Sequence, residues 1–433
     1  MKIIKKHTES LQRVLTVTTL RFFQGGAGVF TAILVSNLFS NEDLGLYYIL
    51  LVISGFWTLI DFGLNQAIIP HYSRTFPLIG QTIHPPKRHA EFRLSFCSLM
   101  LAYGLITVSF FLLMLSFSFF YFHNLGEEIP LIWLVFYAFF VALQIFANAG
   151  FLVMEAIGKF LAFAQLRILT LVIATFVFWS GLIAGLGVYS LILLPGIIAP
   201  LQIIILYRSE VHNCKNFSLQ SIKDVLRKLG PISLKAGAGL WSAYFLMQAP
   251  ILWLPLYIEV DELGPYGLNL AIANVLVALS SAYTISRQDI LGKLAAEKEY
   301  SELRSEFRAS VAIYFLVFAI LASALYAILS TGVIFPQDKL LEAKNWVFLF
   351  FSTFSLGLIG ILSIHARALG TEAFFFVLPA ACFFLYLTVF WQSPTLNLNS
   401  FLSYKFFSFC VFLPLAIIIY IRSYRLHNSH FKL

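Results

Sequence analysis

Residues 130–154 read PLIWLVFYAFFVALQIFANAGFLVM and contain no charged side chain. A helix needs about 20 mostly apolar residues to cross the hydrocarbon core of a membrane, so this run is long enough to span it. Runs of this kind recur, and we interpret twelve of them as membrane-spanning helices. They cover residues 14–38, 44–70, 95–121, 130–154, 166–186, 188–207, 232–257, 266–286, 308–330, 345–366, 372–391 and 401–421. Because the runs are continuously apolar and lack β-barrel alternation, they predict an all-α integral membrane protein.

The composition excludes the main alternatives to a membrane protein. Of the 433 residues, 60% are apolar and 12% are charged, whereas ordinary soluble domains have roughly 45–50% and roughly 25%. The longest gaps between the apolar runs are residues 71–94, 208–231 and 287–307. Each is too short to fold as a domain with its own core. We therefore expect the function to reside inside the helix bundle.

The distribution of Lys and Arg predicts the orientation. If both termini are cytoplasmic, almost all 29 Lys and Arg lie in the cytoplasmic segments, as the positive-inside rule requires. The exceptions are Arg21 and Lys235 within spans, and Lys339, Lys344 and Lys405, which we assign to outer loops. The net charge of +8 therefore reflects membrane-flanking loops, and no nucleic-acid partner is expected.

Two of the long gaps differ in character. Residues 208–231 are basic and fall halfway along the chain, so we predict two six-helix lobes, residues 1–208 and 232–433, joined by a cytoplasmic linker at 209–231. Residues 287–307 carry charges three and four positions apart, which is typical of a solvated helical face.

The two halves share a pattern near their beginnings. Residues 20–28 (LRFFQGGAG) and 234–239 (LKAGAG) each place a cation before small residues, and residues 42–47 (EDLGLY) and 261–266 (DELGPY) match in the loops expected next. The matches predict a parallel internal repeat. Transporters are often built from such repeats, with the substrate site between the halves near the membrane midplane.

Residues 20–28, 41–47 (NEDLGLY) and 59–64 (LIDFGL) resemble the polysaccharide flippases of the Wzx type, within the multidrug/oligosaccharidyl-lipid/polysaccharide (MOP) exporter superfamily. The specific likeness covers roughly residues 10–75; beyond it, helix count, length and the turn at 158–159 agree. The resemblance implies a two-lobe, MATE-like transporter in the cytoplasmic (inner) cell membrane. Its substrate would be an undecaprenyl-diphosphate-linked oligosaccharide for surface polysaccharide such as O-antigen or lipopolysaccharide. A polysaccharide polymerase is then an expected partner.

Three cations are candidates for holding the diphosphate. Arg21 lies roughly 12 Å deep in the first span at 1.5 Å per residue, and a charge at that depth needs a cavity or a partner. It either binds the diphosphate through its planar fork or pairs with a carboxylate of the second span. Lys235, its repeat counterpart, could instead snorkel to the inner interface. Arg167 could be a boundary anchor at the start of the fifth span.

Asp61 is the only carboxylate that we place within the membrane. Its expected depth matches that of Arg21, so it is either the partner of Arg21 or a group that couples transport to H⁺ or Na⁺. Pro250 and Pro255 are candidate hinges, or static kinks, in the seventh span. Further polar side chains could line a cavity for sugar: Gln24, Asn65, Gln144, Asn148, Gln248, Asn269 and Asn274.

Other functions fit the sequence less well. There is no Walker or dinucleotide motif and no zinc-ligand or disulfide spacing, so we expect no cofactor or metal, and energy from an ion gradient or the membrane potential. An ion-coupled multidrug exporter of the same superfamily would need more buried carboxylates than Asp61. A membrane glycosyltransferase or polymerase would need a large external loop. We therefore expect a transporter rather than an enzyme.

Overall fold

The computed structural model describes residues 19, 23, 26–76, 86–127, 129–209, 219–331, 334–369, 376–392 and 396–429. Within these ranges the ordered elements are all helices, and no strand occurs. The predicted all-α class is therefore confirmed. Arg21 and Gln24 lie outside the described residues.

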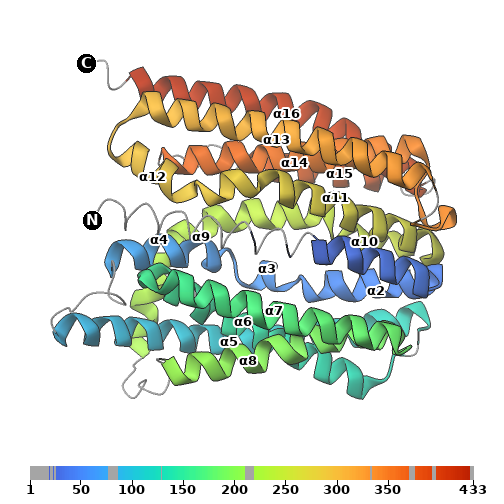
Figure 1. Cartoon of the computed structure of the whole chain (residues 1–433), viewed down its shortest axis with the longest axis horizontal. Coiled ribbons are helices and arrows are strands. Elements are labelled where there is room, and N and C mark those ends of the chain that lie inside the picture. The colour runs from blue at the N-terminus through green and yellow to red at the C-terminus, as the bar shows by residue number, and fades with distance from the viewer. Residues whose placement is uncertain are drawn as a thin grey trace. The chain divides into compact units, whose positions relative to one another are not determined.

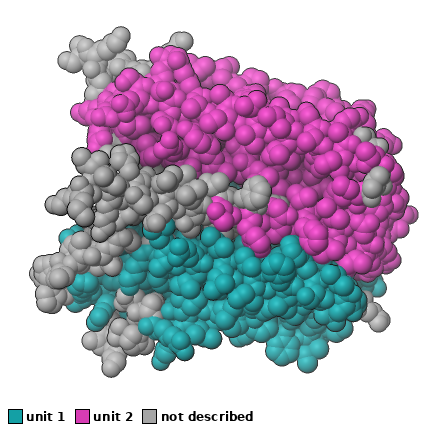
Figure 2. Space-filling model, in the orientation of Figure 1, with its two compact units in different colours: residues 1–16, 50–241 teal, residues 17–49, 242–433 magenta. Residues whose placement is uncertain are grey.

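The chain folds as two compact units (Figure 2). The first contains residues 50–241, and the second contains residues 17–49 and 242–433, as far as these are described. The helix Gly26–Leu38 thus belongs with the later elements. Asn37 Nδ2 donates to the carbonyl of Ile334 (3.1 Å) and Lys339 Nζ to that of Phe39, which explains the grouping. The division at 209–231 expected from the sequence stays a prediction.

The first unit is an antiparallel helical bundle in which α5 packs on α6, and α8 packs on both α6 and α7 (Figure 1). The second predicted span is interrupted, so that it forms parts of three helices, α2, α3 and α4. The elements of this unit are the end of α2 (Asn41–Ser54), α3 (Trp57–Ile60), α4 (Leu64–Thr75), α5 (Pro86–Leu125), α6 (Leu131–Met154), a π-helix (Glu155–Lys159), α7 (Phe160–Ile183), a 3₁₀-helix (Gly187–Ile192), α8 (Leu193–Ser209) and most of α9 (Leu219–Met247).

The second unit centres on α16, which packs along α14 and α15, and on α11, which packs on α13 and α14. Its core includes Leu276, Tyr314, Phe318, Leu358 and Ile361. Besides the helix Gly26–Leu38 and the start of α2, its elements are α10 (Pro250–Trp253), a 3₁₀-helix (Leu254–Leu256), α11 (Val260–Ser286), α12 (Gln288–Ala296), α13 (Tyr300–Ser330), a 3₁₀-helix (Gln337–Lys339), α14 (Ala343–Ala368), α15 (Val377–Gln392) and α16 (Leu398–Ser429).

The described residues include nine helices that are long and apolar enough to cross a membrane, and two shorter apolar helices, Gly26–Leu38 and Val377–Gln392. These lengths and compositions support a multi-pass membrane protein. Every predicted span contains described helical residues. The count of twelve spans and the orientation stay predictions.

Several helices extend beyond their apolar runs. Residues 219–231, expected within the linker, form the first turns of α9. Ile222, Val225 and Leu229 are buried there, while Lys223 and Arg227 are exposed, so the stretch is an amphipathic helix. Residues 287–307 likewise form α12 and the start of α13, as the charge spacing suggested.

The two segments that repeat in sequence, residues 42–47 (EDLGLY) and 261–266 (DELGPY), lie where α2 and α11 contact each other. Each forms the first turn of a helix rather than a loop, with its acidic pair at the positive end of the helix dipole: Glu42 and Asp43 in α2, Asp261 and Glu262 in α11. A Cβ on Gly45 would lie 2.7 Å from the carbonyl oxygen of Val260, and a Cβ on Gly264 would lie 2.5 Å from that of Asn41. The contact is reciprocal, and glycine is required on both sides.

Candidate functional site

The second predicted span is broken beside Asp61. Phe62 (φ 49°) and Gly63 (φ 75°) adopt left-handed conformations between α3 and α4, which is costly for phenylalanine. Helix α9 packs against this break: Ser233 Oγ donates to the Phe62 carbonyl (2.6 Å). A Cβ on Gly237 would lie 2.6 Å from the same oxygen. The break is thus held by close contact with α9.

Asp61 is buried, with 1% of its surface exposed. Tyr103 from α5 donates to Oδ1 (2.6 Å), and the backbone N–H of Asn65 donates to Oδ2 (3.0 Å). The side-chain nitrogen of Asn65, Nδ2, is buried without a hydrogen-bond partner. Among the described residues no cation forms an ion pair with Asp61. Whether Arg21 pairs with it stays open, because Arg21 lies outside them.

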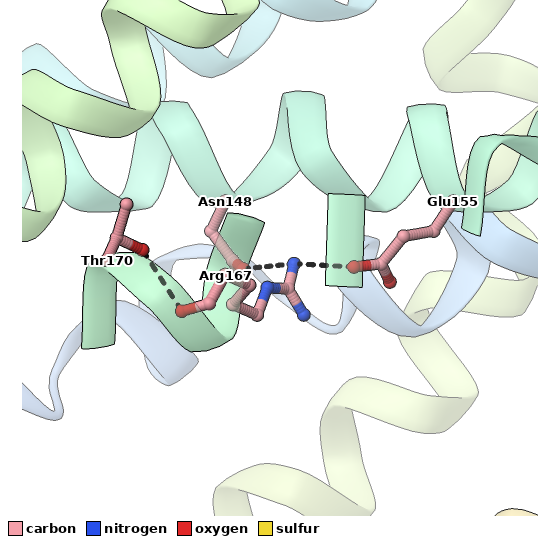
Figure 3. A network of polar contacts seen from close by, with 4 residues as sticks. All are labelled: Asn148, Glu155, Arg167 and Thr170. Carbon is pink, nitrogen blue, oxygen red and sulfur yellow. Dashed lines mark hydrogen bonds and ion pairs between the residues drawn. The ribbon is translucent and has the colours of Figure 1, made fainter. Parts of the chain in front are cut away.

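Arg167 joins a second polar network (Figure 3). From α7, its Nη2 atom lies 3.3 Å from Glu155 Oε1 and donates to Asn148 Oδ1 at 3.2 Å. Its guanidinium also lies over the Phe151 ring, 5.8 Å from the centroid. The Nε–H group is buried without an acceptor. Two predicted candidates, Arg167 and Asn148, are therefore in direct contact.

Glu155 was not expected inside the bundle. It begins the π-helix that follows α6, and only 8% of its side chain is exposed. A π-helix has hydrogen bonds between residues five positions apart, one more than in an α-helix, and often occurs at functional sites. Glu155 is therefore a second carboxylate, besides Asp61, that is largely buried in the described part of the chain. The sequence placed residue 155 just past the inner end of a span, where a carboxylate is unremarkable.

Lys405 was assigned to an outer loop, and this assignment is wrong. It lies in α16 and is fully buried. Its Nζ is 3.3 Å from Tyr266 Oη and lies 5.8 and 5.9 Å from the ring centroids of Tyr266 and Phe401. No carboxylate forms an ion pair with it in the described part of the chain.

The remaining candidates are dispersed. Asn269 is buried in the second unit, where its amide donates to the Pro265 carbonyl (2.5 Å). Pro250 begins α10, and Pro255 lies in the following 3₁₀-helix, so the seventh predicted span is broken there. Gln144, Asn148 and Gln248 are partly buried, whereas Lys235 and Asn274 are exposed. Three buried polar residues, Glu155, Tyr103 and Lys405, were missed by the sequence analysis.

Comparison with solved structures defines the fold class. The chain is similar to a multidrug resistance MATE family transporter of the MOP superfamily in an inward-facing conformation, with a TM-score of 0.65, 14% identity, and coverage of 96% of this chain and 98% of that chain. It is also similar to a mutant form of the Vibrio cholerae MATE transporter VcmN (TM-score 0.66, 14% identity, 98% of each chain).

A third similar structure is the lipid II flippase MurJ in an inward closed conformation. Its TM-score is 0.68 at 12% identity, with 96% of this chain and 92% of that chain covered. No family model and no curated protein matches the sequence. The chain therefore has the all-α fold seen in a MATE family transporter of the MOP superfamily and in MurJ.

Proposed function

We propose that this protein is a membrane transporter that moves an undecaprenyl-diphosphate-linked oligosaccharide from the inner to the outer leaflet by alternating access. The observation that carries the transporter assignment is the fold, which is shared over almost the whole chain with two MATE transporters and with a flippase. The cytoplasmic membrane is the proposed location, and a polysaccharide polymerase the proposed partner.

The choice of an anionic, lipid-linked substrate rests on three supports. The segment at residues 10–75 resembles polysaccharide flippases, MurJ is by its name a lipid II flippase, and Arg21, Lys235 and Arg167 offer cations for a diphosphate. An arginine fork can hold phosphate oxygens in a bidentate manner. In a negative-inside cell, outward movement of each negative charge is favoured by about 2.3 kcal/mol per 100 mV, so the membrane potential can drive export.

An ion-coupled multidrug exporter is the second candidate. Two of the similar structures are MATE transporters, and the buried carboxylates Asp61 and Glu155 favour it, because cationic drugs need such groups. These residues make the two candidates separable by experiment.

The deciding experiment compares Arg21→Ala, Asp61→Asn and the exposed control Arg308→Ala at matched protein abundance. Losing one partner of a buried charged contact costs roughly 3–5 kcal/mol, so Arg21→Ala should abolish surface polysaccharide and accumulate lipid-linked units inside. Arg21→Lys should retain part of the transport, because it keeps the charge but loses the fork. Arg308→Ala should behave as wild type. Intact polysaccharide in a well-expressed Arg21→Ala strain, with drug resistance lost in Asp61→Asn, would instead establish the exporter.

Asp61→Asn separates two roles in the flippase. If Asp61 couples transport to H⁺ or Na⁺, the variant should transport slowly and lose the ion dependence of the rate. If Asp61 only balances Arg21, protein yield should fall while the ion dependence persists. Rates in proteoliposomes at several Na⁺ concentrations and pH values distinguish these results.

A further inference from the structure

The guanidinium of Arg167 is only partly used. It carries five N–H donors, and its hydrogen bond to Asn148 and its ion pair with Glu155 both involve the single atom Nη2. The Nε–H is buried without an acceptor. Buried donors in native proteins are nearly always satisfied, so the Nε–H of Arg167 is available to a further acceptor.

The carboxylate of Glu155 does not accept a hydrogen bond from the Nε–H of Arg167. Only one of its oxygens approaches Arg167, at 3.3 Å, whereas a carboxylate that is paired optimally with arginine makes two parallel hydrogen bonds. Arg167 also keeps 22% of its side chain exposed, against 8% for Glu155. The cation is therefore reachable, and its ion pair with Glu155 involves one nitrogen and one oxygen rather than a bidentate contact.

The backbone at Glu155 offers a way to move this partner. The carboxylate belongs to the π-helix Glu155–Lys159, which lies between two regular helices, α6 and α7. A π-helical turn interrupts the regular α-helical hydrogen-bond pattern and is frequent at functional sites, so the backbone at Glu155 is not part of a continuous α-helix. Asn148 sits in α6 and would remain in place to orient the guanidinium.

We propose that Arg167 is a binding site for a phosphate or diphosphate group, and that Glu155 occupies the guanidinium as an internal competitor until the ligand displaces it. This inference rests on the proposed function and adds a regulated subsite to it. A second anion on this guanidinium would be repelled by the Glu155 carboxylate, so Glu155 opposes binding of the ligand and its displacement favours it.

Pyrophosphate binding to the full-length protein in nanodiscs tests the site without transport. Binding is measured by titration and by the shift of the unfolding temperature, for wild type, Glu155→Gln, Arg167→Gln and the matched control Glu306→Gln. Glu306 forms an ion pair with Arg287 (3.8 Å) in the second unit. We expect Glu155→Gln to bind pyrophosphate at least tenfold more tightly than wild type, Arg167→Gln to lose binding, and Glu306→Gln to be unchanged.

A merely structural ion pair gives a different pattern. Glu155→Gln would then be less stable but no tighter in binding, and Arg167→Gln would bind as wild type does; either result overturns the proposal. If the single variants do not fold, the double variant Glu155→Leu/Arg167→Met removes both charges and still decides the matter. It should be stable yet fail to bind pyrophosphate, and retained binding refutes the site.

Two comparisons identify the source of the phosphate and distinguish a failure of this site from a failure of the proposed function. Polyprenyl diphosphate in the nanodisc should compete with pyrophosphate if the site receives a lipid headgroup, and its failure to compete assigns the site to free phosphates. If wild type does not transport lipid-linked oligosaccharide but the pyrophosphate pattern holds, the site stands and the proposed function fails. If transport occurs and Arg167→Gln binds normally, the site alone fails.

Discussion

Lys405 is a buried cation of α16 that the sequence analysis assigned to an outer loop. Tyr266 and Phe401 supply ring faces and one hydroxyl to its ammonium group, but cation–π contacts contribute only about 0.5–2 kcal/mol each. Desolvation of an ion costs several kcal/mol. As far as the chain is described, these contacts do not offset the burial of this charge.

Replacing Lys405 by methionine tests this balance. Methionine matches the length of the lysine stem without a charge to desolvate, so we expect Lys405→Met to raise the free energy of unfolding by about 1–4 kcal/mol, the range for replacing buried ion pairs by apolar residues. Thermal unfolding in detergent measures it, with the exposed Lys223→Met as control. A lower unfolding temperature would show that the ammonium has a stabilising partner.

The candidate site was only partly predictable at this scale. Arg167 and Asn148 could be identified because a cation and an amide are conspicuous in apolar runs. Tyr103 could not, since nothing in the sequence distinguishes it from the many other aromatic residues until α5 packs beside Asp61. Glu155 was hidden by the span boundary, because the extra residue of the π-helix depends on packing rather than on composition.

At the scale of elements, α4 carries a titratable group, His71, that is influenced by a charge on α9. Burial, and to a lesser extent the nearby Lys228, hold the pKa of His71 below its ordinary value of 6.5. The neutral imidazole is thus favoured in the folded protein, whereas the unfolded chain takes up a proton near pH 6.5. The folded state therefore loses stability as the pH falls below about 6.5.

His71→Gln should remove this pH dependence. We expect the wild-type unfolding temperature to fall between about pH 7.5 and about pH 5.5 by more than that of His71→Gln. Below the pKa of about 6.5 that histidine has in the unfolded chain, wild type must either release a proton on folding or bury a charged imidazole, whereas His71→Gln has no such group. Lys228→Gln should reduce the fall in part. Identical pH profiles for wild type and His71→Gln would contradict the assignment.

Helix existence was predictable and helix ends were not. A rule that counts about 20 apolar residues stops where charges begin, so it truncated α9, whose buried Ile222, Val225 and Leu229 continue the helix amphipathically. The same rule joined α2, α3 and α4 into one span. The break at Phe62 and Gly63 is fixed by the contact with Ser233 and Gly237 of α9, which no local pattern reveals.

For the whole molecule, orientation is the main untested expectation. The positive-inside distribution predicts that both termini face the cytoplasm. A C-terminal alkaline phosphatase fusion should therefore be inactive and a C-terminal green fluorescent protein fusion bright, while a phosphatase inserted after Glu127 should be active. Phosphatase activity at the C-terminus would overturn the orientation or the even number of spans.

The all-α class and the multi-pass character followed from composition, but the grouping of elements into units did not. The described residues among 17–49 join those among 242–433 because of specific contacts such as that between Lys339 and the Phe39 carbonyl. Such contacts connect positions hundreds of residues apart, and a single sequence carries no signal that pairs them.

The reciprocal contact between α2 and α11 bears on how such a chain could arise. Gly45 faces Val260 and Gly264 faces Asn41, so one surface meets a copy of itself, as across the two-fold axis of a homodimer. An ancestor half this length could already have formed this contact between two separate molecules. Gene duplication and fusion would then preserve both glycines, since each accommodates the backbone of the other copy.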